Sequence, residues 1–313
     1  MFDPILQAIS EFQTIIIHRH SRPDGDALGS QIGLKHLILE NFPGKTVFCV
    51  GDEAGFYSFM ADTIMDEIPD SAWEGALALV LDCGGEHLIS DDRWKLAAKT
   101  ARMDHHLYTG CFTDVEAIDS SFESCCGLIC RMAKEAGWKK NPLAAQSLYT
   151  GMVTDSGWFR YDSTSAQTFA LASWLMEEKI DTEKLYKDLY ADDIENKKRK
   201  AQFLLKVQFT PNRVAWIYTT AQELEEMDMS TFSVSRGMVN TMADIRGTDI
   251  WVNFTEADGG VLCELRSSGP NINPIAVKYG GGGHAKASGA KVPDRETAMA
   301  MLRDLDQLTG ETK

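Results

Sequence analysis

The sequence lacks three features that would assign it to common protein classes: a long apolar run, paired cysteines and an excess of basic residues. No apolar stretch reaches the roughly 18 residues that a membrane-spanning helix needs. The first residues, MFDPILQAIS, lack the basic start and apolar core of a secretory signal. The seven cysteines show no CxxC spacing, which argues against a disulfide framework. We therefore expect a reduced, cytoplasmic chain.

The chain carries 46 acidic and 31 basic residues, which gives a net charge of −15. Proteins that bind long nucleic acids usually present a basic face, because their affinity comes from neutralising phosphates. We therefore expect neither a long nucleic acid nor a membrane as partner, whereas a small anionic substrate held by a few local cations is compatible with this charge. Clustered carboxylates are also the groups with which proteins bind hard divalent metals.

The 313 residues, of which 44% are hydrophobic and 25% charged, suffice for two globular domains. In the first part, apolar runs predict strands at 14–18, 45–50, 77–83 and 100–106, and intervening segments predict helices at 26–41, 124–137, 141–154 and 164–179. This alternation is typical of an α/β domain with a parallel sheet and helices on both faces. In such sheets, ligands bind beyond the carboxyl ends of the strands.

The second part of the chain has a different pattern. We place the first domain at 1–185, a linker helix rich in charged helix formers at 186–211, and a smaller α+β domain at 212–313. Within that domain the sequence predicts strands at 213–219 and 249–268, the latter a hairpin turning at 258–260, and a final helix near 294–308.

Histidines and aspartates gather at the predicted strand ends. The first strand leads into HRHSRPDGD, the third ends in LDC and the fourth in MDHH, while TDSG follows a helix. Alone, each has an ordinary explanation, because an Asp before Gly is usually a turn residue and a lone His is usually packed or hydrogen-bonded. Their joint position on one rim of one sheet favours a functional site. The residues are His18, His20, Asp24, Asp26, Asp82, Asp104, His105, His106 and Asp155.

Charge balance on this rim indicates divalent metals. If the rim closes as predicted, four carboxylates and two imidazoles share one pocket: Asp24, Asp26, Asp82 and Asp155 with His20 and His105. Four carboxylates repel one another, whereas two divalent cations cancel their charge and can activate water and clamp a phosphoryl group. The oxygen-rich donors favour Mn²⁺ or Mg²⁺ and leave Fe²⁺ and Co²⁺ as alternatives. Because Cys83 is the only thiol in these segments, we expect no structural zinc site.

Five motifs, in chain order, resemble those of a known family. HSRPDGDALGS, VLDCGG, MDHH and TGMVTDSGWFRY resemble the four motifs of the DHH phosphoesterases, and YGGGGHAKASGA resembles the GGGH segment of the DHH-associated C-terminal domain. The resemblance covers nearly the whole chain and is greatest to the oligoribonuclease/pAp phosphatase (nanoRNase) branch, which has this length and these two domains. It implies a catalytic first domain with a dinuclear metal site and a substrate-binding second domain.

The resemblance also implies a role for each residue of the rim. The ligands would be His20 and Asp24 for one metal, Asp26, His105 and Asp155 for the other, and Asp82 for both. His106 would face the scissile phosphate, and Asp104 would orient the neighbouring histidines. His18 matches no ligand position, so we expect it to pack or hydrogen-bond locally.

In the second domain the resemblance suggests residues that bind the terminal phosphate or base of the substrate: Arg266, Ser267, Gly282, Gly283 and His284. Adjacent glycines let backbone N–H groups approach an oxyanion, and an arginine at a strand end suits a bidentate phosphate contact. A flexible loop is the alternative explanation of the glycines. Lys278 and Lys286 either add positive charge there or are solvated surface residues.

The resemblance implies a phosphoesterase that depends on Mn²⁺, with Mg²⁺ or Co²⁺ as alternatives. It would hydrolyse short oligoribonucleotides to mononucleotides, remove the 3′-phosphate of pAp, or do both. The same residues could instead act on pApA or on cyclic dinucleotides such as cyclic di-AMP. A non-catalytic nucleotide sensor is a third hypothesis, but it would be marked by a lost ligand and all six ligand positions are occupied. Substrate preference, cleavage direction and oligomeric state, with a homodimer as one option, stay open.

Overall fold

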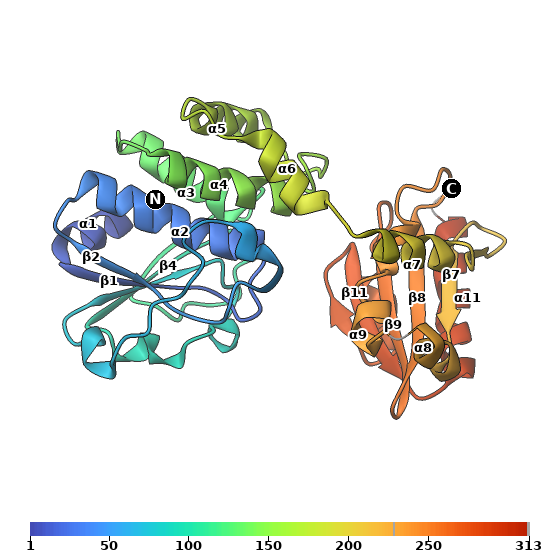
Figure 1. The fold of residues 1–313 in the computed structure, drawn as a ribbon. Helices are drawn as coiled ribbons and strands as arrows, with labels where there is room; N and C mark the ends of the chain where they lie inside the picture. The colour runs from blue at the N-terminus through green and yellow to red at the C-terminus, as the bar shows by residue number, and fades with distance from the viewer. Residues whose placement is uncertain (228, 312–313) are drawn as a thin grey trace. The chain divides into compact units, whose positions relative to one another are not determined.

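The computed structural model describes residues 1–227 and 229–311 and divides the chain into two compact units. Unit 1 is Met1–Ala191 and unit 2 is Asp192–Lys313, and each has its own sheet and helices (Figure 1). The predicted α/β class is confirmed, with a parallel sheet in unit 1 and a mixed sheet in unit 2. No helix within the described residues is long and apolar enough to cross a membrane.

Unit 1 contains a five-stranded parallel sheet with the order β2-β1-β3-β4-β5. The strands are β1 (Thr14–His18), β2 (Thr46–Cys49), β3 (Leu77–Leu81), β4 (Lys99–Asp104) and β5 (Val115–Ile118). The sequence predicted the first four. It gave no signal for β5, because this edge strand is four residues long, only half-buried and not part of an apolar run.

The strands of unit 1 are apolar on both faces, as expected for a sheet covered on both sides. Ile15 and Ile17 of β1 lie in the core beneath the α-helices, whereas Ile16 packs with Trp73 on the opposite face. Val80 of β3 likewise packs with Trp94 on that opposite face. This second face is covered by short 3₁₀ helices rather than by the α-helices that the sequence pattern suggested.

The helices of unit 1 are α1 (Asp3–Glu11), α2 (Gly25–Asn41), α3 (Cys125–Glu135), α4 (Pro142–Asp155), α5 (Ala166–Met176) and α6 (Thr182–Tyr190), with 3₁₀ helices η1 (Gly55–Phe59), η2 (Asp70–Trp73), η3 (Glu86–Leu88) and η4 (Asp92–Leu96). The four predicted helices of unit 1 correspond to α2 to α5 and begin and end close to the predicted positions, whereas α1 and the 3₁₀ helices were not predicted. Polar side chains cap α3 and α4: Ser124 accepts from Gly127 N at 2.9 Å, and Asn141 accepts from Ala144 N at 2.9 Å.

The expected continuous linker helix at 186–211 is instead interrupted. The stretch contains the end of α6 and the whole of α7 (Ile194–Leu204). A new helix begins because Asp193 caps it, accepting from the backbone N–H of Asn196 at 2.7 Å. Leu185 and Leu189 of α6 are buried in the core of unit 1, so this helix belongs to that unit.

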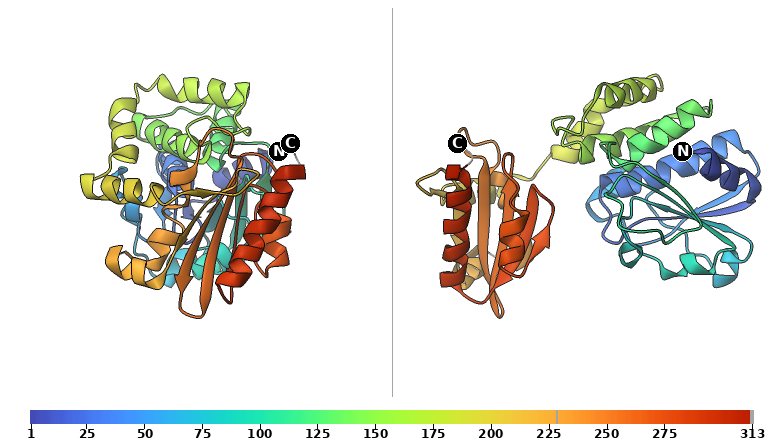
Figure 2. Two further views of the ribbon diagram at one scale, coloured as in Figure 1. Left: turned by 90° about the vertical axis from the view of Figure 1, so that its right-hand side faces the viewer. Right: turned by 180° about the vertical axis from the view of Figure 1, so that it is seen from behind.

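Unit 2 contains a six-stranded sheet with the order β10-β11-β9-β8-β7-β6. Its strands are β6 (Gln208–Phe209), β7 (Ala215–Thr219), β8 (Ile250–Ala257), β9 (Gly260–Ser267), β10 (Gly282–Gly283) and β11 (Ala287–Val292), and its other helices are α8 (Ala221–Met227), α9 (Thr231–Ser235), η5 (Val239–Met242), α10 (Asn273–Lys278) and α11 (Arg295–Glu311). The C-terminal helix, red in Figure 2, packs on one face of this sheet. The predicted hairpin is confirmed: β8 pairs with β9, and Gly259 and Gly260 adopt positive φ in the turn.

Candidate metal centre

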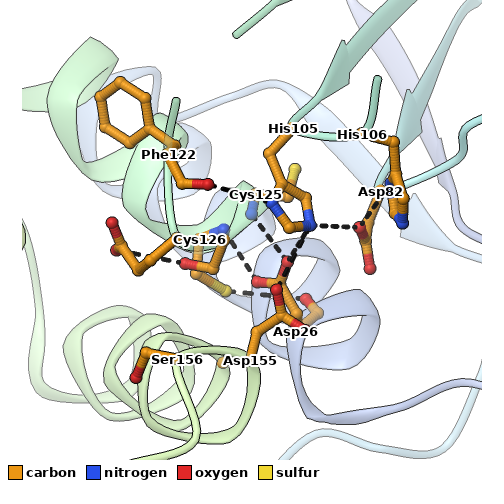
Figure 3. A network of polar contacts seen from close by, with 12 residues as sticks. Asp26, Asp82, His105, His106, Phe122, Cys125, Cys126, Asp155 and Ser156 are labelled. Atoms are coloured by element: carbon orange, nitrogen blue, oxygen red, sulfur yellow. Dashed lines mark hydrogen bonds and ion pairs between the residues drawn. The ribbon is translucent and has the colours of Figure 1, made fainter. Parts of the chain in front are cut away.

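The predicted ligands come together at the carboxyl-end edge of the sheet in unit 1. Three strands contribute: β1 leads to His20, Asp82 follows β3, and β4 leads to His105. Two helix ends contribute the rest, because Asp24 is the N-cap of α2 and Asp155 is the last residue of α4. Asp26 and Asp155, which are more than 100 positions apart in the sequence, thus face one another (Figure 3).

One group of side chains surrounds His105. Its Nε2 lies 3.3 Å from Asp155 Oδ2 and 3.8 Å from Asp26 Oδ2. A second group surrounds His20, whose Nε2 lies 3.7 Å from Asp24 Oδ1. Ligand atoms in each of these groups lie within 4.8 Å of one another.

Asp82 connects the two groups, because it is a member of the His20 group and also contacts His105. Its Oδ1 lies 3.5 Å from His105 Nε2, and its Oδ2 lies 3.5 Å from His20 Nε2. The carboxylate is buried, and Oδ1 has no hydrogen-bond partner among the described residues. Asp82 also has a positive φ of 53°, a conformation that is uncommon outside glycine and that marks functional positions.

Backbone carbonyls orient both imidazoles. His20 Nδ1 lies 2.9 Å from Ser21 O, and His105 Nδ1 lies 3.3 Å from Phe122 O. A carbonyl can only accept, so in each ring Nδ1 donates and Nε2 faces the carboxylates. A protonated ring can donate from Nε2 to these carboxylates, whereas a neutral ring leaves its Nε2 lone pair for a cation that the carboxylates also bind.

The N-terminus of α3 holds Asp26 in place. The carboxylate accepts from Cys125 N at 2.7 Å and from Cys126 N at 2.9 Å, one amide for each oxygen. These amides are among the groups that a helix leaves without internal partners, so they stabilise a buried carboxylate. The adjacent cysteines contribute through their backbone, and their buried thiols have raised pKa values because of burial.

Protonation equilibria in the cluster show its excess of negative charge. Burial, with Asp82 and Asp24 nearby, raises the pKa of Asp155 to about 7. Burial and the neighbouring carboxylates raise the pKa of Asp26 well above its usual range. Burial alone would lower the pKa of His20, but the neighbouring Asp24 and Asp82 carboxylates, which accept from its protonated ring, raise it to about 11. The cluster therefore attracts positive charge, which protons or metal cations can supply.

These observations fit a site for divalent cations. The donors are oxygen-rich with two imidazoles, and no thiol contributes a ligand atom to the His/Asp groups. Such a set suits Mn²⁺ and Mg²⁺ better than a structural zinc ion.

The remaining residues of the rim have distinct surroundings. His106 Nδ1 lies 2.7 Å from Asp104 Oδ1 and 3.6 Å from Asp82 Oδ1, and its side chain is 39% exposed. Asp104 therefore orients His106. His18 lies away from the cluster, on the other face of the sheet, where its Nε2 accepts from Trp73 Nε1 at 3.4 Å.

Two buried residues that sequence reasoning missed support the group around His20. Arg19 donates from Nε to Gln31 Oε1 at 2.8 Å and from Nη1 to the carbonyl of His20 at 3.3 Å. Gln31 Nε2 in turn donates to the carbonyls of Ile17 and Val50, at 2.6 and 2.9 Å. Both side chains are buried. The available signal was a polar residue, Gln31, within an otherwise apolar stretch of α2.

The five candidate residues of unit 2 lie on neighbouring segments at one end of its sheet. Arg266 pairs with Ala287 across β9 and β11, and Gly283 pairs with Ser288 across β10 and β11. Gly283 has a φ of 131°, and a Cβ there would lie 2.6 Å from Ala287 O. A Cβ on Gly282 would meet nothing within 4 Å, so its backbone borders open space.

Several side chains of this region, including two of the five candidates, already form hydrogen bonds or ion pairs within unit 2. Ser267 Oγ donates to Pro270 O at 2.7 Å and accepts from Gly269 N at 3.0 Å, closing a turn. Lys278 pairs with Asp304 at 2.6 Å, and Lys286 bonds to the carbonyl of Gly269. Arg266 Nη1 lies 3.1 Å from Glu264 Oε2.

Family models match most of the chain. A model described as "DHH family, N-terminal domain" matches residues 14–152, and one described as "DHHA1 domain" matches residues 221–311. The matched ranges fall in unit 1 and unit 2 respectively.

Proteins of known name match the whole chain. It is 35% identical over 310 residues to the bifunctional oligoribonuclease and PAP phosphatase NrnA of Bacillus subtilis, covering 98% of both chains. The protein of the same name from Mycoplasma genitalium is 35% identical, with 96% of this chain and 95% of that one covered. Among solved structures, an exopolyphosphatase-related protein from Bacteroides fragilis has the same fold, with a TM-score of 0.87 at 24% identity over 99% of this chain and 97% of that one.

Proposed function

The chain belongs to the DHH family of phosphoesterases, and from this premise we propose that it hydrolyses short oligoribonucleotides to mononucleotides and removes the 3′-phosphate of pAp. Two findings support this substrate class together. The chain is similar along its length to relatives named for these activities, and Asp82 divides its two oxygens between two His/Asp groups. The second observation supports the proposed mechanism, because two His/Asp groups connected by one carboxylate could hold two cations side by side.

We assign the metal ligands as the sequence predicted. His20 and Asp24 would hold one cation, Asp26, His105 and Asp155 would hold the other, and Asp82 would contribute to both. When bound, the cations, with Mn²⁺ as the expected metal and Mg²⁺ or Co²⁺ as alternatives, act as Lewis acids on the phosphoryl group and offset the carboxylate charge.

The remaining candidate residues are proposed to bind and orient the substrate. Asp104 accepts from His106 Nδ1, which leaves the outer nitrogen of the half-exposed ring for a phosphoryl oxygen of the substrate. In unit 2, Arg266, Ser267, Gly282, Gly283 and His284 are proposed to bind the terminal phosphate or base. Open space beside the Gly282 backbone supports this role for the glycines, whereas the Ser267 hydroxyl is committed to its turn.

Replacing Asp82 tests the proposed activity. We expect Asp82→Ala to lower the Mn²⁺-dependent release of mononucleotides from di- to pentanucleotide RNA by more than about 100-fold, because both cations lose a ligand. Asp92→Ala, which removes an exposed carboxylate at the start of η4, is the matched control and should hydrolyse normally. A folded Asp82→Ala protein with undiminished activity would refute the assignment.

A substrate panel distinguishes the remaining alternatives. Short RNA, pAp, pApA and cyclic di-AMP would be compared at equal concentrations with Mn²⁺ and with Mg²⁺. Preference for short RNA and pAp supports the proposal, and preference for pApA or cyclic di-AMP replaces it with a dinucleotide phosphodiesterase. Nucleotide binding without any hydrolysis would identify a sensor instead.

A further inference from the structure

The chain makes a strained turn directly after Asp155. Gly157, Trp158 and Phe159 all have positive φ, at 56°, 67° and 62°. Residues other than glycine rarely adopt this conformation, and such outliers gather at ligand-binding positions. The turn is fixed to the end of α4 by hydrogen bonds, among them Trp158 N to Val153 O at 2.8 Å.

Packing accounts for Phe159 but not for Trp158. The ring of Phe159 contacts those of Tyr149 and Phe169, with centroids 6.0 and 5.4 Å apart. The Trp158 side chain is 48% exposed and touches Tyr190, the last residue of α6, with ring centroids 3.9 Å apart. The strained backbone thus holds the large Trp158 ring partly exposed to solvent, where the ring contributes little to the buried core.

A third aromatic residue connects this pair to the acidic edge. Burial, with the Asp24 and Asp155 carboxylates nearby, raises the pKa of the Tyr57 hydroxyl, which lies next to the backbone N–H of Gly25. Tyr190 has a raised pKa for the same main reason, burial, with Tyr57 among its neighbours. We call Tyr57, Trp158 and Tyr190 the aromatic wall. It comes from η1, the turn after α4 and the end of α6, all within unit 1.

We propose that the aromatic wall stacks a nucleobase of the substrate, with Trp158 as the contacting ring, while the Asp/His cluster holds the adjoining phosphate. The proposal rests on the proposed function and specifies it further. Every nucleobase has a π-face, so stacking tolerates any sequence yet requires a base. Trp158 would therefore make the site selective for nucleotides over inorganic polyphosphate or sugar phosphates.

The test compares pApA with an analogue in which the base of one nucleotide is replaced by hydrogen. We expect Trp158→Ala to raise KM for pApA about 5- to 150-fold, equivalent to ~1–3 kcal/mol of stacking. The same substitution should change KM for the abasic analogue only slightly, because that analogue lacks the base that would stack on Trp158. Trp158→Phe keeps an aromatic ring, so KM for pApA should stay close to that of the unchanged protein. Trp174→Phe, in α5, should behave like the unchanged protein.

Fluorescence gives a second readout that does not depend on turnover. Adding AMP to the Mg²⁺-loaded protein should quench tryptophan emission in the unchanged chain and in Trp174→Phe, but not in Trp158→Phe. An equal rise in KM of Trp158→Ala for both dinucleotides would overturn the role of Trp158 while leaving the proposed function intact. Quenching that persists in Trp158→Phe would have the same consequence. If the unchanged chain hydrolyses neither dinucleotide nor short RNA, the proposed function fails, and this inference fails with it.

Discussion

Arg19 illustrates how a buried residue that is not a ligand can determine the position of one that is. Its guanidinium is fully buried and bonds to Gln31 and to the carbonyls of His20 and Asp52. Burial lowers the pKa of Arg19 to about 10, so the side chain still carries its charge at neutral pH. These bonds fix the backbone directly after the end of β1, next to the proposed ligand His20.

Arg19→Met should therefore weaken both the fold and the metal site. The change keeps the volume but leaves buried acceptors without donors, which costs about 1–3 kcal/mol of unfolding free energy. The Mn²⁺ dissociation constant should rise about 10- to 100-fold, because the support of His20 is lost. Urea unfolding in EDTA and Mn²⁺ titration by electron paramagnetic resonance measure the two effects.

Arg131→Met is the control for Arg19→Met. Arg131 lies on the exposed side of α3 and pairs with Glu135 at 2.7 Å, and surface pairs of this kind contribute less than about 1 kcal/mol. A stable Arg19→Met protein with unchanged Mn²⁺ affinity would show that Arg19 does not position His20.

At the scale of elements, the contact between α2 and α4 sets the width of the candidate site. Asp26 lies in the first turn of α2, and Asp155 is the last residue of α4. The helices approach closely because α2 presents Gly29 to α4: a Cβ there would lie 2.5 Å from Ser147 O and 3.0 Å from Cys126 Sγ. The glycine is needed for close approach rather than for backbone freedom.

Gly29→Ala should separate these helices. We expect a loss of about 1–3 kcal/mol in unfolding free energy from overpacking, together with weaker Mn²⁺ binding, because the two carboxylates move apart. Thermal unfolding and Mn²⁺ titration would measure both. Lys134→Ala, at an exposed position of α3, should change neither. Weakened stability with unaltered Mn²⁺ affinity would mean that the α2–α4 distance does not determine the metal site.

At the scale of the whole molecule, all six proposed ligands lie in unit 1 and none in unit 2. The two units have separate hydrophobic cores: Ile17 and Leu79 lie in one, and Val252 and Leu265 in the other. Metal binding should therefore directly stabilise unit 1, which contains the proposed ligands, and not unit 2.

Calorimetry of the full chain tests this expectation. With Mn²⁺ at about 100 times its dissociation constant, unit 1 should gain about 2.7 kcal/mol. Its unfolding transition should rise by about 5–10 °C relative to EDTA, whereas the transition of unit 2 should stay in place. Asp82→Ala should abolish the shift. A Mn²⁺ effect confined to the transition of unit 2 would contradict the proposed ligand set.

The sequence by itself determined the α/β class, four of the five strands of unit 1, the hairpin of unit 2 and the convergence of the aspartates and histidines. These followed from local patterns: apolar runs specify buried strands, and parallel strands bring their carboxyl ends to one edge. The motif that starts at His18 showed the limit of this reasoning. His18 and His20 look alike in sequence, yet only His20 lies in the cluster. β1 ends at His18, whose ring contacts Trp73, whereas His20 lies beyond the end of the strand, where strand alternation no longer determines its direction.

Only the tertiary structure decided features that depend on contacts between distant segments. Residues 186–211 form parts of two helices because Asp193 caps the second, and the sheet has 3₁₀ helices on one face. The amides of α3 hold Asp26 from about 100 residues away, and Arg19 and Gln31 support His20 from within the core. The aromatic wall assembles from three elements. No local pattern encodes such contacts, because they exist only once the chain has packed.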